Sequence, residues 1–150
     1  MMVTRSNINW LYNTSTNRVR TVFRILLGLF LLYAGISHLT FSRGEFTAQV
    51  PNWLPLSDDL VVVLSGWVEI TLGASLVVLY RWKALTGWVV ALFFVLIFPG
   101  NIAQYTNQTD AFGLNSDTAR LIRLFFQPVL IAWALWSTGA YKAWKQRKRA

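Results

Sequence analysis

The chain has no cysteine in its 150 residues and carries little charge. Without cysteine it forms no disulfide, binds no metal through thiolates and runs no thiol redox chemistry of its own. Charged residues make up 13% of the sequence, against about 25% in a typical soluble domain. Hydrophobic residues make up 55%. These features argue against an ordinary soluble enzyme and indicate an integral membrane protein.

Long apolar segments account for most of the chain, and each has the roughly 20 residues that a helix needs to cross a bilayer. The predicted fold is an all-α integral membrane bundle of four helices, at about residues 23–41, 60–80, 85–104 and 121–141. The length suits one bundle and leaves too little chain for a second domain. The expected organisation is an N-terminal arm, a four-helix domain and a basic tail, at residues 1–22, 23–141 and 142–150.

The distribution of charge predicts how the bundle is oriented. Eleven of the fourteen lysines and arginines lie in the arm or at the adjoining edge of the first span, in the loop between the second and third spans, or in the tail. Five of the six acids lie in the other two loops or at their ends. The positive-inside rule then places both termini in the cytoplasm. We interpret the basic tail as a cluster that contacts anionic lipid rather than as a nucleic-acid site.

A single acid, Glu69, lies in the middle of the second predicted span. An ionisable group at this depth costs about 2.5–3.5 kcal/mol on insertion scales. The carboxyl group must therefore be neutralised, paired or hydrated. Two interpretations stay open: a protonated acid that joins neighbouring helices by hydrogen bonds, or a site for a proton, an ion or a ligand.

Small residues indicate which helix faces pack together, because they let two backbones approach closely. The second span places two glycines on the face that carries Glu69, and the first span does the same for His38. The four expected packing glycines are Gly28, Gly35, Gly66 and Gly73. This repeated spacing predicts a glycine-lined contact between the two spans and directs both polar groups into the bundle.

Further polar groups converge on the outer half of the predicted bundle. The third span contains Pro99 and Gly100, where we expect the helix to break and expose carbonyls. The candidate ligand or proton pocket consists of His38, Glu69, Asn101, Arg123 and Gln127. Arg123 leans toward water, so it is expected to reach Glu69 only through water or a ligand. One histidine and one buried acid are too few ligands for a stable metal site, so none is expected.

The loop between the first two spans contains the sequence VPNWLP, residues 50–55. Its Trp53 lies between two prolines, close to the expected outer interface, where amphipathic rings are enriched. We favour an interfacial anchor for this segment over a lid on a pocket. The residues that follow it, Ser57 to Asp59, are suited to cap the second span.

An ordered series of short motifs runs through the chain. It comprises Arg24 and Gly28, AGISH (34–38), Phe46, VPNWLP (50–55), SGWVEITLG (65–73), FPGN (98–101) and RLFFQPVLIAWA (123–134). Over about residues 20–141, this series resembles the DoxX-like family of small four-span bacterial membrane proteins. The resemblance implies a bundle in the bacterial inner membrane. Some members of that family are subunits of quinone-linked oxidoreductases, and others associate with oxidative-stress or enzyme-maturation systems.

The leading hypothesis is an accessory subunit of a redox system that binds a quinone or similar apolar carrier, with no covalently bound cofactor. Glu69 would handle a proton, His38 or Arg123 would hold a carbonyl oxygen, and Asn101 and Gln127 would orient the ring. No self-contained catalytic motif is present, so no catalytic residue is assigned. In one alternative the chain is a non-enzymatic scaffold for a partner oxidoreductase, and Glu69 serves as packing glue, that is, it joins neighbouring helices by hydrogen bonds. In the other it is a small transporter that works only as a homo-oligomer.

Overall fold

The computed structural model describes residues 9–12 and 14–148, so parts of the predicted arm and tail, including Arg5 and Arg149, lie outside the described residues. Within these ranges the chain forms helices and no β-strand. In chain order these are η2 (Asn9–Leu11), α1 (Arg18–Leu39), α2 (Arg43–Thr47), α3 (Asp58–Val78), η3 (Tyr80–Trp82), α4 (Lys83–Thr106), α5 (Asp117–Ser137) and α6 (Ala140–Arg147). Four helical stretches are long and apolar enough to cross a membrane: α1, α3, α5 and the stretch Tyr80–Thr106 that contains α4. The predicted all-α fold with four such helices is confirmed.

The helix ends differ from the predicted ones by a few residues, because polar capping groups start a helix before its apolar part. The side chain of Asn17 accepts a hydrogen bond from the Arg20 backbone N–H at 2.9 Å, so α1 begins well before residue 23. Ser116 does the same for Ala119 at 3.2 Å and starts α5. Ser57 occupies the N-cap position of α3, but its side chain makes no capping bond.

The last predicted span is interrupted before residue 141. Helix α5 ends at Ser137, and Gly139 adopts a positive φ of 73° that turns the chain into α6. Glycine adopts this left-handed conformation without steric cost. The predicted tail therefore continues as a short helix, which carries the basic residues Lys145 and Arg147 in its last turn.

The expected break at Pro99 and Gly100 is wrong, because α4 continues through both residues to Thr106. Helix α5 likewise runs through Pro128. A proline removes one backbone donor, but in membrane bundles neighbouring side chains can satisfy the backbone groups around it. The carbonyl that loses its helical donor at Pro99 is that of Val95. Next to it, the carbonyl of Phe94 in α4 accepts a hydrogen bond from the Gln127 side chain of α5 at 2.6 Å.

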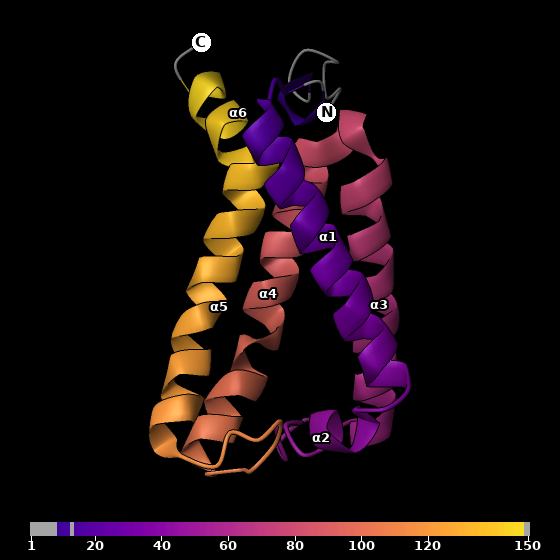
Figure 1. Cartoon of the computed structure of the whole chain (residues 1–150), viewed down its shortest axis with the longest axis vertical. Coiled ribbons are helices and arrows are strands. Elements are labelled where there is room, and N and C mark those ends of the chain that lie inside the picture. Colours follow the sequence, from indigo (N-terminus) through magenta and orange to yellow (C-terminus); the bar gives the residue numbers. More distant parts are fainter. Residues whose placement is uncertain (1–8, 13, 149–150) are drawn as a thin grey trace.

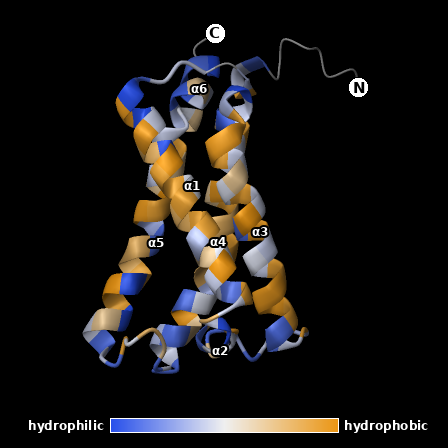
Figure 2. Cartoon of the chain, turned by 45° about the vertical axis from the view of Figure 1, so that its right-hand side comes forward, coloured by the Kyte–Doolittle hydropathy of each residue, from blue (hydrophilic) through white to orange (hydrophobic). Residues whose placement is uncertain are grey.

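The long helices form two tightly packed pairs, α1 with α3 and α4 with α5, with looser packing between the pairs. Figure 1 shows the pairs diverging toward α2. We call the end with the start of α1 and with α6 the termini end. The opposite end, with α2 and the 107–116 segment, is the loop end. Figure 2 shows hydrophobic residues along the middle of the long helices and hydrophilic ones at both ends.

Glycines bring α1 and α3 into backbone contact. A Cβ built on Gly35 would lie 2.6 Å from the carbonyl oxygen of Gly66. One built on Gly73 would lie 2.6 Å from the carbonyl oxygen of Gly28. Real Cβ atoms do not approach so closely, and the obstacle is backbone rather than a side chain that could rotate away. The four glycines named from their spacing therefore face each other in two pairs across this contact.

Candidate functional site: a cavity between the helix pairs

A cavity of about 510 Å³ lies between the two helix pairs in the loop half of the bundle. Its wall is mostly apolar and is built from α1 to α5 together with the segments that join them. All five residues of the predicted pocket lie on this wall: His38, Glu69, Asn101, Arg123 and Gln127. Side chains from helices far apart in the sequence therefore surround one space, as their positions along the spans suggested.

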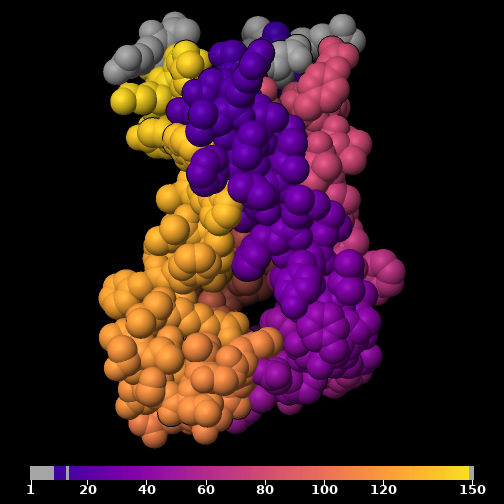
Figure 3. All heavy atoms as spheres, in the orientation of Figure 1, coloured from indigo at the N-terminus to yellow at the C-terminus, as the bar shows by residue number. Residues whose placement is uncertain are grey.

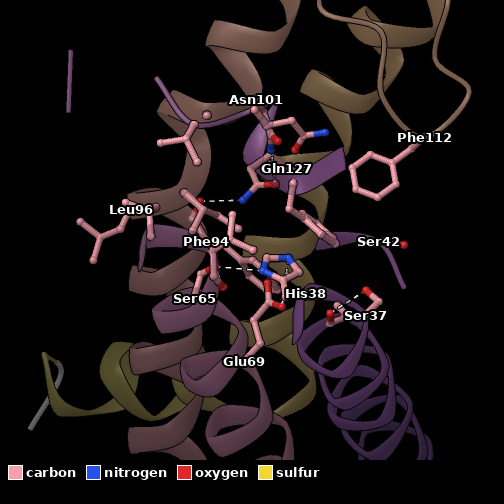
Figure 4. A pocket seen from close by; sticks show the side chains of 18 of the residues that line it. Ser37, His38, Ser42, Ser65, Glu69, Phe94, Leu96, Asn101, Phe112 and Gln127 are labelled. Atoms are coloured by element: carbon pink, nitrogen blue, oxygen red, sulfur yellow. Dashed lines mark hydrogen bonds and ion pairs between the residues drawn. The ribbon is translucent and has the colours of Figure 1, made fainter. Parts of the chain in front are cut away.

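His38 and Glu69 form the polar part of one side of the cavity (Figure 4). His38 Nε2 lies 3.5 Å from Glu69 Oε2, and His38 Nδ1 lies 2.9 Å from Ser65 Oγ. The Ser65 hydroxyl donates its one proton to the carbonyl of Val62 at 2.9 Å. Ser65 must then accept from His38, so Nδ1 carries the ring hydrogen of the neutral histidine. Nε2 is left as an acceptor that faces the carboxyl group.

The Glu69 carboxyl group is buried, and one of its oxygens lacks a hydrogen-bond partner. The residue is 5% exposed, and its Oε2 atom makes no hydrogen bond within the described part of the chain. At 3.5 Å the contact with His38 is too long for a strong hydrogen bond. A buried polar atom without a partner is rare and calls for an explanation such as a bound group that satisfies it. The position of Glu69 on the cavity wall supplies the space for such a group.

Asn101 and Gln127 are bonded to each other on another part of the wall. Asn101 Nδ2 donates to Gln127 Oε1 at 2.9 Å, and Gln127 Nε2 in turn donates to the Phe94 carbonyl. Figure 4 shows these side chains above His38 and Glu69 in that view. The pair joins α4 to α5, so part of its bonding capacity already serves the fold. Only its remaining donors and acceptors can meet a ligand.

Arg123 makes no contact with Glu69 and bonds a residue that the sequence did not single out. Its Nη2 donates to Gln49 Oε1 at 2.9 Å, and its guanidinium lies 4.9 Å from the centre of the Phe112 ring. Gln49 is 8% exposed, and its Nε2 donor has no partner among the described residues. No ion pair joins Arg123 to an acid in the part of the chain that the structure describes. The cavity wall therefore presents an unused amide donor beside an uncompensated cation.

Two aromatic rings close the loop end of the cavity. The Phe46 ring lies 3.3 Å from the His38 ring and 4.6 Å from the Phe112 ring, centre to centre. The backbone N–H of Phe112 donates to the carboxylate of Glu45, which follows the start of α2. Phe112 also has a positive φ of 56°, an unfavourable conformation for a bulky residue that surrounding contacts must hold in place.

The VPNWLP segment is exposed at Trp53 and also borders the cavity. Trp53 is 69% exposed, as expected for an interfacial anchor. Trp53, Leu54 and Pro51 nevertheless line the cavity. The segment is therefore also part of the cavity wall.

Arg120 holds the 107–116 segment against the bundle. Its guanidinium is buried and bonds three groups: the Thr109 carbonyl at 3.3 Å, Asp117 at 2.8 Å and Asp110. The buried side chain of Gln104 donates to the same Thr109 carbonyl at 3.4 Å. This cluster lies outside the cavity lining, but it fixes the segment that places Phe112 at the cavity's end.

Arg120→Ala is expected to loosen the 107–116 segment. Hydrogen bonds from a charged group contribute about 1.5–3 kcal/mol, so the local free energy of opening should fall by about 2 kcal/mol. Hydrogen–deuterium exchange of the backbone amides of residues 107–116 measures this. Arg43→Ala is the matched control, because Arg43 pairs with Asp59 at 2.6 Å on the exposed surface and should leave that exchange unchanged.

Several wall residues were missed from the sequence, and the signals for them differ. Ser65 precedes Glu69 by four residues, so helical periodicity could have placed it on the same face. Phe46, Gln49 and Phe112 reach the cavity from short turns, and no periodicity predicts where such side chains point. Among the described residues, no group of three or more histidine, cysteine, aspartate or glutamate side chains could hold a metal ion.

Residues 27–138 match a family described as a domain of unknown function (DUF8561). The matched range contains most of the four long helices and all five predicted pocket residues. No curated protein and no solved structure matches the chain. Because the match covers well over half of the sequence, the chain belongs to the DUF8561 family.

Proposed function

We propose that the chain is a membrane-embedded accessory subunit of a redox system, and that its cavity binds a quinone or similar apolar carrier. The observation that carries this proposal is the buried Glu69 oxygen, unpartnered beside His38 on the wall of a mostly apolar cavity. Such a site suits a molecule that is apolar over most of its surface and has a few oxygen atoms. The motif series that resembles the DoxX-like family adds support.

The size and donors of the cavity fit this class of ligand. Ligand pockets in proteins are typically about 300–1,000 Å³, and a space of about 510 Å³ holds a ring with part of a chain. Quinone oxygens accept hydrogen bonds. The Gln49 Nε2 group and a protonated Glu69 are the unused donors that could meet them.

Reduction of a quinone to a quinol takes two electrons and two protons. A chain without cysteine supplies no thiol electrons, so a partner oxidoreductase would deliver both electrons. The Glu69–His38 pair can hold one transferable proton between Oε2 and Nε2, and it would take up a second from water after each transfer. The role of this chain would be to place the ring and provide the protons.

The resemblance to the DoxX-like family supports a location in the bacterial inner membrane, and the charge distribution supports an orientation with both termini in the cytoplasm. Helices α1 and α6 carry basic residues at the termini end, including Arg18, Arg20, Lys142 and Lys145. Under the positive-inside rule, the loop end with its cavity would lie in the outer half of the bilayer.

Glu69→Gln tests the binding site. The change keeps the shape of the side chain but replaces the acidic O–H donor with a weaker amide donor that cannot give up its proton, and it should weaken binding of a short-chain benzoquinone by about tenfold, or about 1.4 kcal/mol. Binding can be followed in lipid nanodiscs by quenching of tryptophan fluorescence, since Trp53 lines the cavity. Thr71→Val is the control on the same helix, because Thr71 is exposed and its hydroxyl bonds only its own helix. Equal affinity of the Glu69→Gln and control proteins would contradict the proposal.

The scaffold alternative predicts that a leucine at Gly66 or Gly73 abolishes assembly with a partner. These glycines pack against glycines of α1 within the chain. A substitution there would first disrupt this bundle, so failed assembly with a partner would not by itself favour a scaffold. A scaffold would instead have to use the outward-facing apolar side chains, which lipid covers equally well.

A further inference from the structure

The cavity is bounded differently on its two lateral sides, between α3 and α4 and between α1 and α5. On the first side, the segment that follows α2 crosses to α4. A Cβ built on Gly100 would lie 3.4 Å from the carbonyl oxygen of Gln49, which is ordinary contact distance. Pro51 and Leu54 of the same segment also line the cavity. The chain itself therefore crosses this side, although Leu96 of α4, which also lines the cavity, is 67% exposed.

The loop end, which faces water in a membrane, is also bridged. The Phe46–Phe112 contact, the Arg123–Gln49 hydrogen bond and the bond from the Phe112 N–H to Glu45 all join α2 and its neighbours to the opposite helix pair. A ligand entering from this direction would have to break these contacts. The loop end of the cavity is thus closed by interactions between the two helix pairs.

The side between α1 and α5 has no such cover. Figure 3 shows a hollow between these helices in the loop half, with atoms of α4 visible deep inside it. Phe30 and Tyr33 of α1 and Phe126 of α5 line the cavity, yet they are 43%, 64% and 48% exposed. Exposed cavity-wall side chains on both helices, with no described segment crossing between them, mark the edges of an opening. In a membrane that opening faces acyl chains.

We propose that the cavity is filled from the bilayer through the gap between α1 and α5, and that its occupant is a lipid whose apolar chain lies in this gap. The identity of the head group rests on the proposed function, whereas the route of entry does not. The occupant's polar end lies beside Glu69 and Gln49, the two wall residues with unused buried polar atoms. The apolar edges of the gap select chain-bearing molecules over water-soluble ones.

The test is photo-crosslinking in lipid nanodiscs with two probes. One is a benzoquinone with a diazirine on its isoprenoid chain, and the other is phosphatidylcholine with a diazirine on one acyl chain. Leu31 and Leu130 are the reporters, because both line the cavity and both are buried from the outer surface. Peptide mass spectrometry should find adducts at these two residues in the unmodified chain, and excess unlabelled quinone should reduce them at least fivefold.

A matched pair of variants tests the gap itself. Ala34 lines the cavity on α1, so Ala34→Trp should block the opening and reduce adducts at Leu31 and Leu130 at least fivefold. Ile36 is exposed on the same helix and outside the lining, so Ile36→Trp should leave the adducts unchanged.

The outcomes separate the two proposals. Adducts from phosphatidylcholine without adducts from the quinone would support the route and reject the quinone. Absence of adducts at Leu31 and Leu130 with both probes would overturn the route. So would adducts confined to Val61 and Leu96 on the opposite side, or equal labelling of the two tryptophan variants. Mapping in the unmodified chain decides the matter even where a variant fails to fold.

Discussion

Gly35→Ala is expected to separate α1 from α3 and to lower the free energy of unfolding by about 1–3 kcal/mol, the usual range for overpacking. The new Cβ would lie 2.6 Å from the Gly66 carbonyl oxygen and 2.9 Å from the Ile70 backbone nitrogen. Neither atom can move unless the two helices move apart. Gly35→Leu should prevent folding, since the longer side chain has no space at this contact. Denaturant titration of the purified protein, followed by circular dichroism, measures both changes.

Gly44→Ala is the matched control for that substitution. Gly44 lies within α2, and a Cβ built there meets no atom within 4 Å. Alanine also has the higher helix propensity, by about 1 kcal/mol, so this change should leave stability equal or slightly higher. If both alanine variants unfolded at the same denaturant concentration, the backbone contact between α1 and α3 would not be a determinant of the fold.

The glycine contact also determines the site. His38 of α1 meets Ser65 and Glu69 of α3 only because the two backbones are so close, and a Cβ on Gly66 would lie 2.9 Å from the His38 Cβ. A substitution that separates these helices should therefore weaken ligand binding as well as stability. The opposite pair, α4 and α5, is held by the Asn101–Gln127 hydrogen bond and by the bond from Gln127 to Phe94.

The parts of the molecule that follow helical periodicity could be predicted from the sequence. Apolar length gave the four long helices, and glycine spacing placed Glu69 and His38 on facing helices. Both depend on regular geometry that repeats every 3.6 residues. Helix ends were less predictable, because Asn17 and Ser116 start helices by side-chain capping outside the apolar runs.

The cavity's end could not be predicted in the same way. Gln49 and Phe112 reach it from turns, and the Phe112 backbone adopts a positive φ that its residue type disfavours. The continuous helix through Pro99 was also missed, because a proline in isolation indicates a break. In each case the decisive contacts come from residues distant in the sequence.

Packing differs along the length of the bundle. The buried hydrophobic cluster that includes Leu27, Leu76 and Val90 joins the helices, whereas the cavity occupies the loop half. Interiors that are packed at normal density give a protein its stability. An open space whose wall holds two unpartnered buried polar atoms, Gln49 Nε2 and Glu69 Oε2, reduces stability. The proposed ligand would offset part of that cost.

Glu69→Leu and His38→Leu are expected to have unequal effects, and the difference separates a ligand site from packing glue. Glu69→Leu removes a buried polar oxygen that has no hydrogen bond, while His38 keeps its bond to Ser65. The free energy of unfolding should stay within about 1 kcal/mol of the unmodified protein or rise. Quinone binding should nevertheless fall by tenfold or more, because the acid that meets the ligand is gone.

His38→Leu should cost more stability than Glu69→Leu. It removes the hydrogen bond to Ser65 and the weak 3.5 Å contact with the Glu69 carboxyl, which then lies among apolar side chains, and the loss of a buried hydrogen-bond partner costs about 1–3 kcal/mol. The double variant, with leucine at both positions, should recover the part of that loss that comes from the buried acid, with a coupling energy of about 0.5–3 kcal/mol between the two sites. Denaturant titration of all four proteins completes the cycle. If Glu69 only joined neighbouring helices, Glu69→Leu would be the more destabilising single change, and quinone affinity would fall only in proportion to stability. If the acid serves a ligand, His38→Leu must be the more destabilising of the two changes.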